Sequence, residues 1–168
     1  LQLVSNGDSV FIRQGDSLLA LSRLTGKRTW THVLDEPDTS SYPGAQFRNM
    51  SYRATQSDSS DLGTRSLCAY RPESGGEPRI VMLDHSTKVG FLRSGKAVYR
   101  QNRLLAFDAL SGKLIWRLGR SEDTRSVAYG LAFTAPPTPA GEVLVAPAVR
   151  ESGFYLVGIT HAGAIKWL

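Results

Sequence analysis

A short segment that recurs along the chain constrains the fold more than any other feature of the sequence. Residues 106–116 read Ala-Phe-Asp-Ala-Leu-Ser-Gly-Lys-Leu-Ile-Trp, and residues 20–30 read Ala-Leu-Ser-Arg-Leu-Thr-Gly-Lys-Arg-Thr-Trp. Both are preceded by two leucines, and seven of the thirteen positions that start at Leu18 and Leu104 are identical. The two tryptophans are 86 residues apart, which is about two periods of a roughly 40-residue repeat. The chain is therefore expected to stack repeated units.

Two weaker copies complete the pattern. One ends the sequence at Trp167 and lacks one turn residue, and the other keeps most features but has Arg79 where the tryptophan should be. A polar segment at 35–66 departs from the repeat and is expected to be either an extended inter-strand loop or a partly disordered insertion. We therefore predict copies near 18–30, 67–79, 104–116 and 156–167.

Each copy has the pattern of a β-hairpin. Leu104–Phe107 is an apolar run that fits a strand. Residues 108–112 are turn formers that include a glycine, and Lys113–Trp116 fits the second strand of the hairpin. A tryptophan buries on the order of 200 Å², and a unit this small must bury it against a neighbouring unit. Residues with little or no side chain leave room for that indole. The predicted docking residues are Ala20, Gly26, Trp30, Ala69, Gly75, Ala106, Gly112, Trp116, Gly158, Gly163 and Trp167.

The rest of the chain also favours strands. No stretch shows sustained helical periodicity, so almost no helix is expected. After the third copy, Val127–Phe133 is predicted to form a strand. The predicted fold class is therefore all-β.

The repeat resembles the tryptophan-docking motif of the quinoprotein (PQQ-like) β-propellers, Ala-x-Asp-x-x-Thr-Gly-Lys-x-x-Trp. Residues 106–116 depart from it only at Ser111, and residues 20–30 depart only at Ser22. The resemblance implies a propeller of four-stranded antiparallel blades, of which this family has seven or eight. A chain of 168 residues would supply about four blades. We expect part of a larger ring, completed by the remainder of the propeller or by other protein chains, rather than a free-standing four-bladed ring. The resemblance also implies export, with the periplasm as the expected compartment.

Composition narrows the function classes. The net charge is +5, but the arginines are scattered and no nucleic-acid motif is present, so no nucleic-acid partner is expected. No apolar run is long enough to span a membrane. Cys68 lies on an expected strand, which favours a buried thiol over a nucleophile. His32, His85 and His161 lack metal-ligand spacing. We therefore predict no catalytic, cofactor-binding or metal-binding residues.

Three functions remain open. The preferred hypothesis is a non-catalytic scaffold that binds other proteins. The second is a fragment of a dehydrogenase that uses PQQ and calcium, as the resemblance implies. Against it, the acidic group at 35–38 lacks the glycine and final glutamate of a calcium loop. The third is a sugar- or polymer-binding propeller that uses rim aromatics such as Tyr42 and Tyr52.

Overall fold

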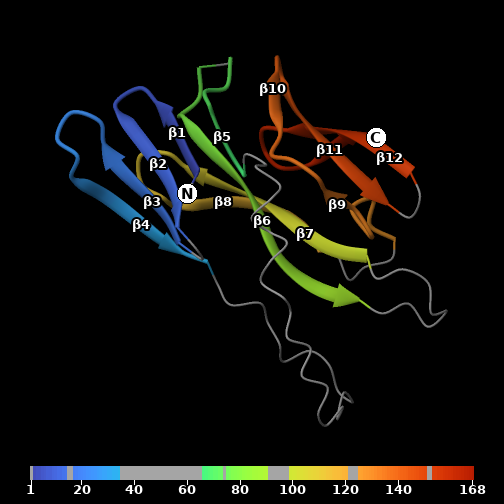
Figure 1. Cartoon of the computed structure of the whole chain (residues 1–168). Helices are drawn as coiled ribbons and strands as arrows, with labels where there is room; N and C mark the ends of the chain where they lie inside the picture. Colours follow the sequence, from blue (N-terminus) through green and yellow to red (C-terminus); the bar gives the residue numbers. More distant parts are fainter. Residues whose placement is uncertain are drawn as a thin grey trace, which may run out of the picture.

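The fold consists of antiparallel β-sheets placed side by side (Figure 1). The computed structural model describes residues 2–14, 17–34, 66–73, 75–90, 99–120, 125–150 and 153–168, and these residues form strands and turns but no helix. The expectation of an all-β chain is confirmed for them. Within these ranges no helix could cross a membrane.

Three sheets follow one another along the chain, and each is a meander of consecutive strands. The N-terminal sheet contains β1 (Gln2–Asn6), β2 (Ser9–Gln14), β3 (Ser17–Ser22) and β4 (Arg28–Val33). The middle sheet contains β5 (Leu67–Tyr70), β6 (Arg79–Gly90), β7 (Tyr99–Asp108) and β8 (Leu114–Gly119). The C-terminal sheet contains β10 (Thr138–Ala140), β11 (Val143–Arg150), β12 (Gly153–Thr160) and β13 (Ile165–Trp167), and the short β9 (Ala132–Phe133) pairs with β11.

The middle sheet is buried on both faces. Because side chains alternate along a strand, neighbouring residues of β6 and β7 point into different cores. One face packs against the N-terminal sheet through Ile80, Met82, Leu105 and Phe107, together with Phe11 and Leu18. The other packs against the C-terminal sheet through Val81, Leu83, Leu104 and Ala106, together with Phe133, Leu144, Val157 and Ile159. This explains the continuous apolar run at 104–107, which has no polar face.

The structure corrects the prediction for residues 67–79. The segments 18–30, 104–116 and 156–167 each form the last hairpin of a sheet, whereas residues 67–79 form β5 and the start of β6 at the opposite edge. Like the docking hairpins, they contain an apolar strand and a glycine turn, and these two features are common in antiparallel hairpins. The described residues therefore hold three docking hairpins in three sheets. The polar segment lies outside the described residues apart from Ser66.

The predicted strand at 127–133 is also wrong for most of its length. Residues 127–130 form a turn, in which the Tyr129 amide donates to the Ser126 carbonyl at 2.9 Å. Gly130 has φ +72°, a conformation that a strand excludes. Only Ala132–Phe133 pairs as β9, so apolar composition alone misassigned this segment.

Candidate functional site

The turn between β7 and β8 is organised by its own side chains. The Asp108 carboxylate accepts hydrogen bonds from the Ser111 amide at 2.7 Å, the Ser111 hydroxyl at 2.6 Å and the Leu110 amide at 3.2 Å. These bonds, led by that from the Ser111 hydroxyl, hold the pKa of Asp108 below its ordinary value. Gly112 follows with φ +72°. The turn is thus held by hydrogen bonds between its own residues.

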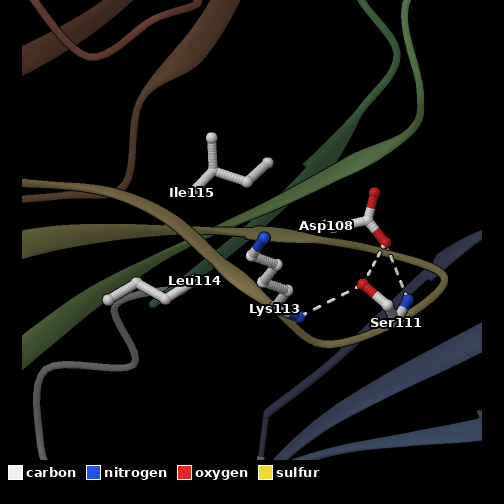
Figure 2. A pocket seen from close by; sticks show the side chains of 5 residues that line it. All are labelled: Asp108, Ser111, Lys113, Leu114 and Ile115. Carbon is white, nitrogen blue, oxygen red and sulfur yellow. Dashed lines mark hydrogen bonds between the residues drawn. The ribbon is translucent and has the colours of Figure 1, made fainter.

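Figure 2 shows the same turn beside a surface depression lined by Asp108, Ser111, Lys113, Leu114 and Ile115. The Asp108 carboxylate and the Ser111 hydroxyl hydrogen-bond to each other and to backbone amides of the turn. The polar groups of the depression therefore serve the turn, and the geometry indicates no general acid or base here.

Trp30 of β4 docks on this turn. Its indole Nε1 donates to the Ala109 carbonyl at 3.0 Å. A Cβ added at Gly112 would lie 2.6 Å from the indole Cδ2, so only glycine allows this approach. The N-terminal and middle sheets are therefore joined by an indole that stacks on a glycine and donates to a turn carbonyl.

Trp116 of β8 repeats the arrangement on the C-terminal sheet. Its Nε1 donates to the His161 carbonyl at 3.0 Å, and a Cβ at Gly163 would lie 2.5 Å from its Cγ. The side chain of Trp116 is only 8% exposed. The Arg79 guanidinium donates to the same carbonyl. Two successive sheet boundaries therefore use one type of contact.

The predicted small residues lie across each hairpin from the tryptophan. The strand registers pair Ala20 with Trp30, Ala106 with Trp116 and Gly158 with Trp167. At Gly158 a Cβ would come within 2.2 Å of the Trp167 ring. Ala69 and Gly75 do not belong to this set, because Ala69 pairs with Ile80 and a Cβ at Gly75 would meet nothing within 4 Å.

The docking contact has two halves, an indole and a glycine turn, and the C-terminal and N-terminal sheets each contain one half that no described residue covers. Trp167 of β13 is 43% exposed. In the N-terminal sheet, Gly26 has the same left-handed conformation as Gly112, with φ +66°, but a Cβ there would meet nothing within 4 Å. The described chain thus presents an indole at one end and an open glycine turn at the other.

Sequence analysis missed a buried polar network between β6 and β7. Asp84 is fully buried, and its carboxylate accepts from Arg103 Nε at 2.7 Å and lies 4.0 Å from an Arg120 nitrogen. Nearby, the buried Asn102 amide donates to the Phe133 carbonyl at 2.6 Å and accepts from its amide at 2.7 Å. The sequence marked Asp84, which interrupts the apolar run of β6, but Asn102 lies in the polar first half of β7 and had no such signal.

The network does not fit the calcium ion that the quinoprotein resemblance raises. A divalent cation prefers several free oxygen ligands, but the Asp84 carboxylate already faces two guanidinium groups. No group of three or more His, Cys, Asp or Glu side chains that could hold a metal occurs in the described part of the chain. His32, one of the three histidines considered as metal ligands, instead packs its imidazole edge-on against the Phe107 ring, with 4.6 Å between the ring centroids. No chemical step is therefore derived through a calcium ion at Asp84.

Cys68 lies on β5 and is half-buried. Burial raises the pKa of its thiol from 9.0 to about 11, so at neutral pH the thiolate fraction falls about 100-fold. Since the thiolate is the nucleophile, this environment suits a structural thiol.

We expect native Cys68 to react with iodoacetamide at least about 100-fold more slowly than the same residue in the unfolded chain. Mass spectrometry of samples quenched over time at neutral pH would measure both rates. N-acetylcysteine, with and without denaturant, controls for the effect of the denaturant on the reagent. Equal rates in the native and unfolded protein would contradict the raised pKa.

Comparison with known proteins bears on the fold. No family model and no curated protein match this sequence. Among solved structures, the chain is similar to a europium-containing methanol dehydrogenase, with 13% sequence identity and a TM-score of 0.56. The match covers 99% of this chain and 23% of the enzyme chain. This chain therefore spans less than a quarter of that protein.

At this identity the likeness concerns the fold alone. The enzyme is a propeller protein, and the three four-stranded meanders, stacked face to face, agree with propeller blades. We therefore refer to them below as the N-terminal, middle and C-terminal blades. The described residues do not by themselves form a closed ring.

Proposed function

We propose that this chain is a propeller-type protein-interaction module that acts as a scaffold, and that its function requires no cofactor. The observation that supports this best is the uncovered apolar face of the C-terminal blade. Phe154 and Leu156 of β12 are 87% and 60% exposed, and Trp167 lies on the adjacent strand. Exposed apolar side chains on one sheet face mark a surface for other protein to cover, either another chain or the remainder of the propeller.

The middle blade shows what such a face does when it is covered. By register, Leu156 of the C-terminal blade corresponds to Leu104 of the middle blade. Leu104 is fully buried against the C-terminal blade. The exposed face of the C-terminal blade thus has the same arrangement of residues as the face of the middle blade that packs against a β-sheet. The proposed partner is a protein surface of comparable shape.

The alternative function is a segment of a quinone- and calcium-dependent dehydrogenase, which the family resemblance of the repeats implies. Asp84, the fully buried acidic residue, is paired with arginine and is therefore a poor calcium ligand. The sugar-binding hypothesis relies on Tyr42 and Tyr52, which lie outside the described residues. Export to the periplasm remains a prediction from the family resemblance.

Site-directed photocrosslinking in the native host tests the proposal. We expect a benzophenone amino acid at Leu156 to give a discrete protein adduct. The matched control at Glu142, an exposed polar residue on the β10–β11 turn, should give none. The absence of an adduct at Leu156 would overturn the scaffold function. Alcohol-dependent dye reduction by the purified chain with added PQQ and calcium would establish the alternative in its place.

A further inference from the structure

We propose that the boundary between the middle and C-terminal blades binds a small monovalent anion of the chloride class. The anion site consists of Tyr70 on β5, Arg79 at the start of β6 and His161 in the β12–β13 turn. It lies between two blades of this chain and is separate from the exposed apolar face of the C-terminal blade. Its existence therefore does not depend on the proposed interaction function.

The three side chains of the anion site form one group across the blade boundary. The Tyr70 ring stacks on the His161 imidazole, with 5.4 Å between the ring centroids and 26° between the ring planes. The strand register places Arg79 directly opposite Tyr70, and the Arg79 guanidinium donates to the His161 carbonyl. Burial raises the pKa of Tyr70, and the Arg79 guanidinium beside its hydroxyl opposes part of that rise.

Each of these side chains buries a polar atom that has no hydrogen-bond partner. The three atoms are the Tyr70 hydroxyl oxygen, Arg79 Nε and His161 Nδ1. Tyr70 as a whole is only 5% exposed. Burying a polar group without a hydrogen bond is unfavourable, and native proteins contain few such groups. Three of them in one group of neighbouring side chains therefore indicate a bound species that supplies the missing partner.

The chemistry of the three atoms favours an anion over a water molecule as that partner. Arg79 Nε can only donate, a tyrosine hydroxyl can donate, and His161 Nδ1 donates when it carries the imidazole proton. Arg79 also places a positive charge in a partly buried position, where within the described ranges it forms no ion pair with a carboxylate. Asp108, its register partner on β7, accepts instead from Ser111 and Leu110 of its own turn. One anion would accept from all three donors and balance the guanidinium charge.

The other blade boundary shows that docking of a tryptophan does not require these three side chains. There Trp30 donates to the Ala109 carbonyl, which takes the position of the His161 carbonyl. The strand registers supply the other two equivalent positions, which are Asn6 for Tyr70 and Ser9 for Arg79. The tyrosine, arginine and histidine are therefore additions that the docking contact itself does not explain.

Chloride titration of the full 168-residue chain tests the anion site. Urea unfolding is followed by circular dichroism at neutral pH, with sodium gluconate replaced stepwise by sodium chloride at constant ionic strength. Gluconate is too large to reach three fully buried atoms, so chloride alone should raise the unfolding midpoint, and the rise should saturate. The chlorine NMR signal, which bound chloride broadens and added bromide narrows again, measures the same binding without denaturant.

Two variants locate the bound anion. Arg79→Gln removes the positive charge, whereas Tyr70→Phe removes only the hydroxyl and keeps the ring on His161. Each should weaken chloride binding at least about tenfold, which is the loss expected for one hydrogen bond to a charged group. Arg71→Gln is the matched control, because Arg71 is an exposed arginine next to Tyr70, and it should leave chloride binding unchanged.

Equal unfolding midpoints in chloride and gluconate, with no broadening of the chlorine signal, would overturn the proposal and leave a buried water as the partner of the three atoms. Chloride binding that persists in both Arg79→Gln and Tyr70→Phe would also contradict it, because the ion would then lie elsewhere. If Arg79→Gln does not fold, the wild-type titration and Tyr70→Phe still decide. The photocrosslink at Leu156 tests the interaction function separately.

Discussion

Replacement of Trp116 by alanine is expected to lower the free energy of unfolding by about 3–5 kcal/mol. The indole is 8% exposed, and its Nε1 donates to the His161 carbonyl at 3.0 Å. Truncation would leave a cavity over Gly163 and would remove one of the two hydrogen bonds to the His161 carbonyl, to which Arg79 also donates. Urea denaturation followed by circular dichroism measures the loss.

Two variants control this experiment. Trp116→Phe keeps a ring in the site and should recover part of the stability. Trp167→Ala removes an indole that is 43% exposed and should lower the free energy of unfolding much less. A cost below about 1 kcal/mol for Trp116→Ala would show that the indole does not join the two blades.

The second large effect is expected from a single methyl group at Gly112. A Cβ there would lie 2.6 Å from Cδ2 of Trp30, and φ is +72°. A left-handed conformation costs an alanine about 1–2 kcal/mol, and forced overpacking adds about 1–3 kcal/mol. We therefore expect Gly112→Ala to lower the free energy of unfolding by about 2–5 kcal/mol and to shift Trp30 fluorescence towards that of a solvated indole.

Gly7→Ala isolates the backbone part of this effect. Gly7 has φ +60°, but its added Cβ would meet nothing within 4 Å. Gly7→Ala should therefore lower the free energy of unfolding by only about 1–2 kcal/mol and leave Trp30 fluorescence unchanged. Equal losses for the two variants would mean that the indole does not lie against Gly112.

The docking contact between Trp30 and Gly112 could be predicted from the sequence because it requires particular residue types. At Gly112, φ is +72° and an indole lies against the backbone, so a larger residue does not fit. The segment at 67–79 misled the prediction because an apolar strand followed by a glycine turn is common among hairpins. Arg79, in place of tryptophan, marked it as different, and the pairing of β5 at the other edge of its sheet explains why.

The buried polar network could not be derived from spacing. Asp84 and Arg103 face each other across β6 and β7, and their pairing depends on a register set by many apolar contacts. Asn102 satisfies both backbone groups of Phe133 in the next blade. Such a long-range contact has no local signature. The uncovered ends likewise became visible only when equivalent positions of successive blades could be compared.

Indole proton exchange tests the docking arrangement most directly. In a two-dimensional nitrogen–proton NMR spectrum of dilute protein, assigned with tryptophan-to-phenylalanine variants, the Trp30 and Trp116 indole protons should exchange slowly. Their rings should show nuclear Overhauser contacts to the α protons of Gly112 and Gly163, while the Trp167 proton exchanges fast. Fast exchange of all three protons, with no contact to either glycine, would contradict the stacking of blades described above.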